Sequence, residues 1–329
     1  MEGRALRADA VFEGGGVRGI AFAGAVSAFE EAGYEWHFLA GTSAGAIVAA
    51  LLAAGYKAAE LRQLLDETDF RRLATRTGVE RVPLLGPLTS LCSHFGIHSA
   101  ANLESWLADL LAARGVKTFG DLAVPSQAVQ AGLRHRLQVV ASDVTNRRML
   151  LLPRDAESLG FDPDRLSVAL AVRMSISIPL FYKPVRIWVS GKEVLVVDGG
   201  LLSNFPVWIF DEPGRPRWPA FGFRLIDPPP ARKLGRGPLA LYRYMVALVE
   251  TSMEGRAKHD LAQRDWVRTV DIPTHGIRAT NFGLDKDQKL VLYNSGRQAA
   301  LAFLKNWDFQ RYVELYGPGG AASAKAPAS

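Results

Sequence analysis

Residues 11–56 read VFEGGGVRGIAFAGAVSAFEEAGYEWHFLAGTSAGAIVAALLAAGY and contain two glycine-rich turns. The first turn, GGGVRG, spans residues 14–19, and the second, GTSAG, spans residues 41–45. Each turn follows a short apolar run and precedes a predicted helix, so backbone N–H groups and positive helix ends point to one edge of a sheet. The stretch therefore predicts two strand–turn–helix units of an α/β fold, in which helices pack on the faces of a parallel sheet.

The rest of the chain continues this alternation. Predicted strands are residues 10–12, 36–40, 136–142, 149–152, 185–189, 193–197, 220–226 and 267–272. Predicted helices are residues 20–32, 44–54, 58–66, 103–111, 164–175, 238–264 and 286–307. Residues 70–98 mix arginine with proline and glycine, so we predict a long loop or lid there. We expect one domain over residues 1–316 and a disordered tail, rich in Gly, Ala, Ser and Pro, over residues 317–329.

The composition indicates a folded chain that does not cross a membrane. Its 329 residues are 48% hydrophobic, enough to bury a large core. The longest apolar run, residues 44–54, is too short to span a bilayer, and no apolar run near the N-terminus predicts a signal peptide. Cys92 is the single cysteine, so we expect a reducing compartment, the cytoplasm. The net charge of +6 favours anionic surfaces, although solubility alone explains so modest an excess.

One interpretation of the first turn is a nucleotide-binding loop, because Gly14-x-Gly16-x-x-Gly19 has the spacing of the dinucleotide fingerprint. That fingerprint requires an acidic residue about 20 positions later, at the end of the next strand. Here the next strand ends in Leu39-Ala40-Gly41, which contains no acid. No Gly-Lys-Ser/Thr follows the turn either, so the P-loop pattern is also missing. We therefore do not expect a nucleotide site.

The second turn, Gly41-x-Ser43-x-Gly45, has the form of a nucleophile elbow. A serine on such a strand-to-helix turn is lifted above the sheet edge, and the glycines avoid clashes with neighbouring backbone. A helix-capping serine is the alternative. The position of Ser43 between an apolar strand and an alanine-rich helix favours the nucleophile.

If Ser43 is a nucleophile, the first glycine turn can stabilise the charge that forms in the reaction. Acyl transfer creates an oxyanion, which backbone N–H groups around Gly15, Gly16 and Val17 can stabilise. Arg18 can add positive charge for the oxyanion or for a phosphate head group. A tight turn with a solvated arginine is the structural alternative.

A serine nucleophile needs a base, and the chain offers two kinds of candidate. None of its six histidines lies at a strand end framed by glycines. Asp198 does, because it follows the apolar run VLVV and precedes Gly199 and Gly200. Asp-Gly is also a common plain turn. In the company of the elbow and the glycine loop, Asp198 is the better candidate for the base.

Four segments of the chain, taken in order, resemble motifs of the patatin-like phospholipase family, whose members use a Ser–Asp dyad. The glycine loop corresponds to residues 14–19, the elbow to residues 41–45, and the segment before the aspartate to residues 173–179, RMSISIP. The Asp-Gly-Gly motif corresponds to residues 198–200. The resemblance covers residues 12–206 and leaves the last third of the chain without a substrate assignment.

The resemblance implies a three-layer α/β/α sandwich with a mostly parallel central sheet, and lipid acyl hydrolase activity without metal or cofactor. It implies that Ser43 and Asp198 are catalytic. The implied oxyanion hole comprises Gly14, Gly15, Gly16, Val17, Arg18 and Gly19, and the implied supports of the elbow and dyad are Gly41, Thr42, Ala44, Gly45, Gly199 and Gly200. Glu13 departs from the aspartate that the family often has before the glycines, a change that we expect to matter little.

The implied substrate is a phospholipid or lysophospholipid at a peripheral membrane surface, with no nucleic acid partner. Apolar residues within 84–95 and 178–182 can line an acyl channel or simply pack in the core. The sequence leaves open a transacylase that uses the same acyl-enzyme, a non-catalytic lipid-binding protein and the need for a protein activator. An α/β-hydrolase with a Ser-Asp-His triad is disfavoured, because that fold places its elbow later than the second strand.

Overall fold

A computed structural model of the chain describes residues 6–73, 85–125, 133–212, 214–226, 240–259 and 263–317. Its central feature is an eight-stranded sheet with the order β10-β9-β1-β2-β4-β8-β7, in which β5 also pairs with β4. The strands are β1 (Leu6–Phe12), β2 (Tyr34–Thr42), β4 (Leu137–Asp143), β5 (Arg148–Leu152), β7 (Val185–Val189), β8 (Lys192–Asp198), β9 (Ala220–Ile226) and β10 (Thr269–Pro273).

The sheet is parallel through β10, β9, β1, β2 and β4. Both β5 and β8 run antiparallel to β4, and β7 runs antiparallel to β8. The predicted α/β class with a mostly parallel sheet is therefore confirmed, and residues 149–152 belong to a hairpin as their spacing from β4 suggested.

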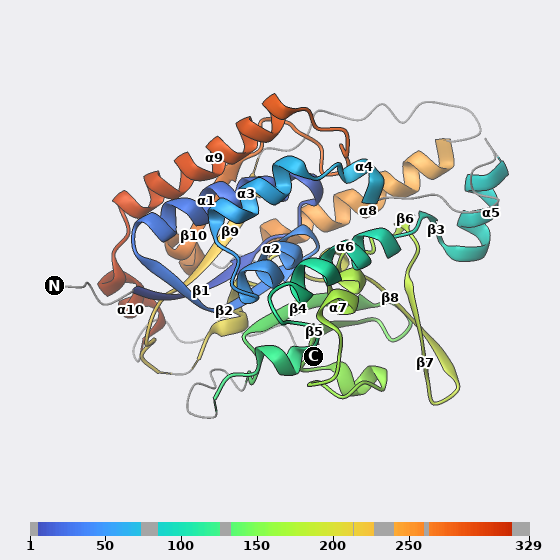
Figure 1. Cartoon of the computed structure of the whole chain (residues 1–329), viewed down its shortest axis with the longest axis horizontal. Coiled ribbons are helices and arrows are strands. Elements are labelled where there is room, and N and C mark those ends of the chain that lie inside the picture. The colour runs from blue at the N-terminus through green and yellow to red at the C-terminus, as the bar shows by residue number, and fades with distance from the viewer. Residues whose placement is uncertain are drawn as a thin grey trace.

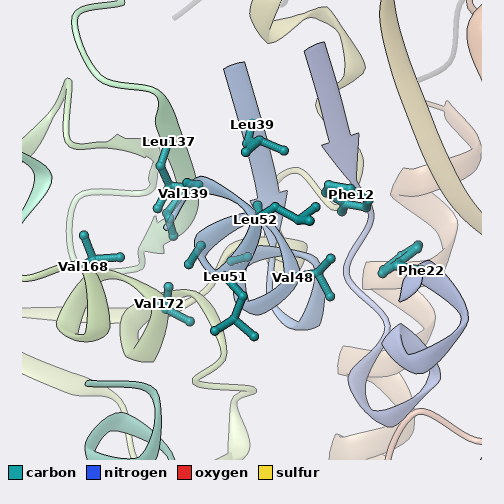
Figure 2. Packing of buried hydrophobic residues seen from close by; sticks show 14 of the residues in the cluster. Phe12, Phe22, Leu39, Val48, Leu51, Leu52, Leu137, Val139, Val168 and Val172 are labelled. Atoms are coloured by element: carbon teal, nitrogen blue, oxygen red, sulfur yellow. The ribbon is translucent and has the colours of Figure 1, made fainter. Parts of the chain in front are cut away.

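Helices flank this sheet (Figure 1). They are α1 (Ile20–Glu31), α2 (Ala44–Ala53), α3 (Ala58–Glu67), α4 (Phe70–Leu73), α5 (Leu85–His94), α6 (Ala101–Ala112), α7 (Val168–Ser175), α8 (Ala240–His259), α9 (Lys286–Lys305) and α10 (Phe309–Tyr316). The main helical layer packs on one face, where α2 is buried almost throughout because its alanines allow close approach to the strands (Figure 2).

The two faces of the sheet are covered unequally. Side chains alternate along β1, so Ala10 and Phe12 belong to the core beneath the helices, while Val11 faces the other side. There Val11 packs in a smaller cluster with Phe210, the last residue of the 3₁₀ helix η7 (Val207–Phe210), and with Phe205, which precedes η7. In the described part of the chain, η7 and the residues just before it thus cover this part of the second face.

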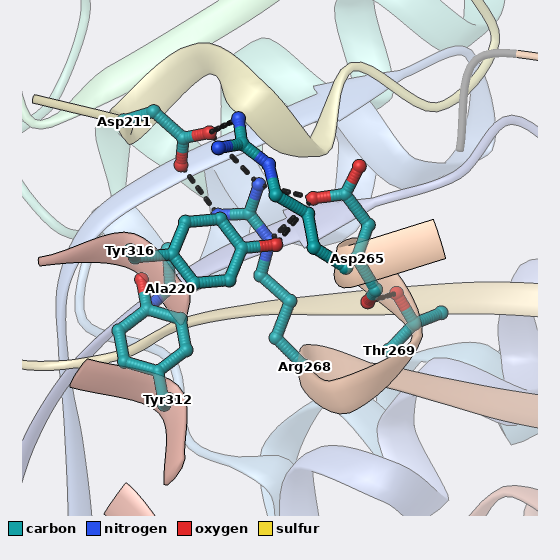
Figure 3. A network of polar contacts seen from close by, with 8 residues as sticks. Asp211, Ala220, Asp265, Arg268, Thr269, Tyr312 and Tyr316 are labelled. Atoms are coloured by element: carbon teal, nitrogen blue, oxygen red, sulfur yellow. Dashed lines mark hydrogen bonds and ion pairs between the residues drawn. The ribbon is translucent and has the colours of Figure 1, made fainter. Parts of the chain in front are cut away.

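A buried ionic network holds the C-terminal elements in place (Figure 3). Arg268 is fully buried at the end of the 3₁₀ helix η8 (Gln263–Arg268). Its guanidinium donates to Asp211 Oδ2 at 3.0 Å and to Asp265 Oδ1 at 2.7 Å, and the Tyr316 hydroxyl donates to Asp265 Oδ1. Because a buried cation without partners is very costly, this pairing fixes η8, α10 and the segment after η7 relative to one another.

The prediction of a loop over residues 70–98 is wrong for much of its length. The structure has α4, α5 and a short strand, β3 (Gly96–His98), which pairs in parallel with β6 (Leu180–Tyr182). Pro87 misled the prediction, because proline is tolerated in the first turn of a helix, where its missing N–H has no intrahelical partner. The buried Ser90 hydroxyl then donates to the Gly96 carbonyl at 2.6 Å and ties α5 to β3. Residues 74–84 lie outside the described residues.

Two predicted helices are shorter in the structure by more than two residues. The helix predicted over residues 164–175 begins only at Val168, where the Ser167 hydroxyl caps it by accepting from the Leu170 amide at 3.3 Å. The helix predicted over residues 238–264 is α8, and residue 264 and the start of the strand predicted at 267 belong to η8 instead. The predicted tail lies outside the described residues from residue 318 onward.

The crossing of α1 and α9 depends on two glycines. A Cβ placed on Gly24 would lie 1.9 Å from the Tyr293 carbonyl oxygen, and a Cβ placed on Gly296 would lie 1.8 Å from that of Ala21. The two helices therefore touch backbone to backbone, which only glycine permits at these positions.

We predict that Gly296→Ala destabilises the protein by about 1–3 kcal/mol, because the added methyl forces the two helices apart. Gly255→Ala is the control, since a Cβ on this α8 glycine meets nothing within 4 Å. Urea denaturation followed by far-UV circular dichroism measures both variants. Equal midpoints for the two would contradict the close crossing.

Candidate active site

The elbow holds Ser43 in a strained backbone conformation between β2 and α2. Its φ of 53° and ψ of −123° are unfavourable for a residue with a side chain. A Cβ on Gly41 would lie 2.3 Å from the Gly45 carbonyl oxygen, and a Cβ on Gly45 would lie 2.3 Å from that of Phe12. Only glycines at both positions let the chain turn this sharply, and the turn presents the Ser43 hydroxyl at the strand end.

Ser175 fastens the elbow from the end of α7. Its hydroxyl accepts a hydrogen bond from the Ser43 amide at 2.8 Å and donates one to the Val140 carbonyl at 2.6 Å. Ser175 is fully buried, so this bridge between the elbow and β4 is shielded from water. The bridge helps to hold Ser43 in its strained conformation.

Asp198 meets Ser43 because two strands end head to head on one edge of β4. Thr42, the last residue of β2, pairs with Val140, and Asp198, the last residue of β8, pairs with the next residue, Ala141. The other edge of β4 is occupied by β5 along this stretch, so β2 and β8 share a single edge. The two strands approach from opposite directions, and their ends bring the serine and the aspartate together.

The Asp198 carboxyl is buried, and its two oxygens differ in their hydrogen bonds. Its Oδ1 accepts from the Gly200 amide at 2.8 Å, while Oδ2 has no hydrogen-bond partner of normal geometry among the described residues. Burial raises the pKa of Asp198 to about 7, and the adjacent Ser43 hydroxyl and the Gly200 amide oppose this shift by favouring the charged form. A carboxyl with a pKa near neutrality is suited to act as a general base.

The glycine loop offers two backbone donors. Within the described part of the chain, the amides of Gly15 and Gly16 make no hydrogen bond, and both residues line the cavity that contains Ser43. The Val17 amide, a third predicted donor, instead donates to the Ala279 carbonyl at 3.0 Å. The oxyanion donors that this geometry leaves available are therefore Gly15 and Gly16.

Arg18 braces the loop rather than projecting into solvent. It is buried, at 7% exposure, and its Nε donates to the Gly15 carbonyl at 3.1 Å. The side chain also borders the cavity, so its charge lies close to the place where an oxyanion would form. The alternative of a solvated arginine is wrong for this conformation.

Glu13 and Asn204 hold the glycine loop in place through hydrogen bonds. Glu13 Oε2 accepts from the Leu225 amide at 2.6 Å, and Oε1 accepts from Asn204 Nδ2 at 3.2 Å. The same Nδ2 donates to the Gly14 carbonyl at 3.2 Å. Burial raises the pKa of Glu13 to about 7, against the opposing effects of the Leu225 amide and the charge of Arg18. Glu13 thus connects the loop to β9, a role that sequence reasoning did not assign.

The remaining predicted residues support this arrangement. The Thr42 hydroxyl donates to the Ser203 carbonyl at 3.3 Å. Ala44 begins α2 against Gly19 of the loop, and a Cβ on Gly199 would lie 2.3 Å from the Val140 carbonyl oxygen. All of the predicted site residues therefore gather where β1, β2 and β8 end.

A narrow cavity of about 60 Å³ leads to Ser43. Its lining comes from the loop, the elbow, α8 and the segment after β10, and consists of Gly14, Gly15, Gly16, Arg18, Ser43, Ile178, Asn204, Glu250, Met253, Arg278, Ala279 and Thr280. None of these described lining residues is a histidine. Among the residues that the structure describes, no group of three or more His, Cys, Asp or Glu side chains could hold a metal ion.

Sequence reasoning missed Ser175, Asn204 and the α8 residues of the cavity. Ser175 was within a segment singled out by the resemblance, but nothing local marked it as the partner of the Ser43 amide. Asn204 follows Asp198 by six residues, and its link to Glu13 spans most of the chain. Such contacts arise from tertiary packing and leave no periodic signal in the sequence.

Comparison with known proteins finds a matching family and similar sequences. Residues 10–211 match the model of the Patatin-like phospholipase family. The uncharacterized protein YqhO of Bacillus subtilis (strain 168) is 37% identical over 302 residues, covering 92% of this chain and 99% of its own. The uncharacterized NTE family protein Rv2565 of Mycobacterium tuberculosis is 30% identical over 246 residues, covering 69% of this chain and 33% of its own.

A solved structure shares the fold. The crystal structure of VipD from Legionella pneumophila superposes with a TM-score of 0.55 at 19% identity, covering 92% of this chain and 67% of VipD. At this identity the likeness shows a common fold and nothing further.

The buried carboxyl of Asp198 has a consequence for stability. The folded protein keeps the protons of Asp198 and Glu13 up to about pH 7, whereas the unfolded chain releases them near pH 4. The folded state therefore loses stability as the pH rises from about 4 to about 7.

We predict that Asp198→Asn raises the free energy of unfolding at pH 8 by up to about 4 kcal/mol and leaves it nearly unchanged at pH 4, because the amide never has to ionise. Urea denaturation at both pH values measures the effect. Glu314→Gln, which removes an exposed carboxyl from α10, is the control. A variant that is less stable than the parent at pH 8 would refute the explanation.

Proposed function

Because this chain belongs to the patatin-like phospholipase family, we propose that it hydrolyses carboxylic esters of phospholipids or lysophospholipids through Ser43 and Asp198. Membership of the family supports lipid acyl hydrolase activity. The observation that carries the assignment to these residues is the meeting of the strained Ser43 and the buried Asp198 beside two unpaired loop amides.

In the proposed mechanism, Asp198 Oδ2 accepts the proton of Ser43 while Ser43 Oγ attacks the ester carbonyl carbon. The carbonyl oxygen becomes an oxyanion, and the Gly15 and Gly16 amides donate to it. When the tetrahedral intermediate collapses, the C–O bond to the leaving alcohol breaks and the alcohol takes the proton from Asp198. The acyl group then remains on Ser43 Oγ.

Deacylation repeats these steps with water as the nucleophile. Asp198 accepts a proton from water, the resulting hydroxide attacks the acyl carbon, and the loop amides again stabilise the oxyanion. Collapse breaks the bond to Ser43 Oγ, which recovers its proton from Asp198 and releases the fatty acid. An acceptor alcohol in place of water would give the transacylase alternative.

We expect Ser43→Ala to abolish hydrolysis of a short-chain p-nitrophenyl ester and labelling by a fluorophosphonate, since both need the same nucleophile. Asp198→Asn should lower kcat/KM by about 10²–10⁴-fold, because its amide cannot accept a proton. His275→Ala, at an exposed loop position, is the control and should match the parent. Full activity of Asp198→Asn would rule out the dyad and require another base.

We also expect the activity to follow the protonation of Asp198. Because burial raises the pKa of Asp198 to about 7, log(kcat/KM) for the soluble ester should rise with unit slope below that pH and level off above it. Stopped assays in buffers of constant ionic strength give this profile. A flat profile between pH 5 and pH 8 would contradict the assignment of Asp198 as the base.

A further inference from the structure

The side chain of Asn204 is buried at the catalytic cavity with one of its two polar atoms unpaired. Asn204 is 5% exposed and lines the cavity that leads to Ser43. Its Nδ2 donates to the Gly14 carbonyl and to Glu13 Oε1, both at 3.2 Å. Its Oδ1 is buried and accepts no hydrogen bond from the described residues. Because an unpaired buried acceptor is unfavourable, Oδ1 needs a donor from a molecule inside the cavity.

The two contacts of Nδ2 determine which way the amide faces. A backbone carbonyl can only accept, so the atom that faces the Gly14 carbonyl is the NH₂ group and not the oxygen. The opposite orientation would place Oδ1 against that carbonyl and lose its hydrogen bond. Oδ1 is therefore held on the other side, where it can act only as an acceptor.

Oδ1 lies close to both the nucleophile and the base. A Cβ placed on Gly14 would lie 2.3 Å from Asn204 Oδ1 and 3.2 Å from Ser43 Cβ. A Cβ placed on Gly200 would lie 2.7 Å from Asn204 Oδ1 and 3.1 Å from Asp198 Oδ1. One water molecule, which reaches up to about 3 Å to each acceptor, can therefore donate to Asn204 and to the Asp198 carboxylate at the same time.

The cavity has room for such a water. Its volume of about 60 Å³ holds a few water molecules. A buried water needs about two to four polar partners, and Asn204 Oδ1 and the Asp198 carboxylate provide two acceptors. The amides of Gly15 and Gly16 are donors and stay available for the oxyanion.

We propose that Asn204 Oδ1 holds the water that releases the acyl group from Ser43, and that it thereby favours hydrolysis over transfer of the acyl group to an alcohol. This inference rests on the proposed acyl hydrolase function. It decides between the hydrolase and transacylase forms of that function.

In this step, one O–H of the water points to Asp198 and the other to Asn204 Oδ1. Asp198 takes the first proton as the water oxygen forms its bond to the acyl carbon, and the carbonyl π electrons move to the oxyanion. The second proton stays on the water oxygen throughout. Collapse of the intermediate breaks the bond to Ser43 Oγ, which takes its proton from Asp198. The released carboxylic acid carries the second proton.

An alcohol with a single hydroxyl cannot use both acceptors. Its O–H has to point to Asp198 for the proton to be removed, so Asn204 Oδ1 faces a lone pair or an alkyl group. A buried polar group that is left unpaired disfavours the analogue without the matching donor. During acylation by an ester of such an alcohol, the departing oxygen likewise has no second proton for Oδ1. The acceptor therefore stabilises attack by water alone.

Bracing of the glycine loop is the competing role of Asn204. Its Nδ2 holds the Gly14 carbonyl, and the loop amides stabilise the oxyanion in acylation and in both forms of deacylation. Weaker bracing therefore slows every step together, whereas loss of Oδ1 slows only attack by water. The ratio of the two deacylation products separates these roles.

The test compares Asn204→Leu, which keeps the size of the side chain without its polar atoms, with Arg18→Met. The control removes the hydrogen bond from Arg18 to the Gly15 carbonyl and so loosens the same loop without removing Oδ1. Each protein is incubated with p-nitrophenyl butyrate and methanol, which has a single O–H, and NMR quantifies methyl butyrate and butyrate. We expect the ratio of ester to acid to rise about tenfold in Asn204→Leu and to stay within about twofold of the parent in Arg18→Met, even where both variants are slower.

A crystal structure of the parent protein gives a test that needs no variant. It should show an ordered water within hydrogen-bond distance of both Asn204 Oδ1 and the Asp198 carboxylate. Oδ1 bound to a protein donor, or without a water at that position, would overturn the proposal.

The product ratios also keep this proposal apart from the proposed function. An unchanged ratio in Asn204→Leu would overturn the role of Oδ1 while the hydrolase assignment stands, because the ester is still cleaved through Ser43. An equal rise in Arg18→Met would assign the effect to the loop and likewise overturn the role of Oδ1. A parent that cleaves no ester and is not labelled by a fluorophosphonate would overturn the proposed function itself, and the role of this water with it.

Discussion

The site depends on the way β4 changes partner along one edge. β2 pairs with its first half and β8, arriving from the opposite direction, pairs with its second half. The two incoming strands stop at adjacent residues of β4, and each continues into a glycine-framed turn. Ser43 and Asp198 are therefore neighbours because of strand register, which hydrogen bonds enforce along the whole of β4. A flexible loop could not hold these two side chains in place with the same accuracy.

The surrounding core supports groups that are unfavourable to bury or to strain. Asp198 and Glu13 are buried carboxyls whose ionisation opposes folding, and Ser43 holds a strained backbone conformation. Each is fixed by contacts from elsewhere in the chain, such as the Ser175 bridge and the amide of Leu225. Hydrophobic packing of α1, α2 and α7 on the sheet offsets the unfavourable free energy of these groups (Figure 2). These few residues therefore lower the stability of the fold that surrounds them.

The helix α8 lies between the cavity and solvent. One side of this helix closes the cavity with Met253 and Glu250, while another leaves an apolar stripe in solvent. A helix that served only to cover the site would bury its apolar residues against the domain. α8 thus has one side that closes the cavity and another side that leaves apolar residues exposed.

The sequence alone determined the class of fold, the elbow, the glycine loop and the two candidate catalytic residues. These features are local: glycine spacing reports sharp turns, apolar runs report buried strands, and both act within a few residues. The prediction from sequence failed at residues 85–98, because the proline in the first turn of α5 was taken as a helix breaker. It also did not identify Ser175 or Asn204 as part of the site. Only the tertiary structure decided that β8 runs antiparallel to β4, that Val17 is not a free donor, and that α8 borders the cavity. Those outcomes follow from strand register and packing between segments far apart in the chain, which no periodicity in the sequence encodes.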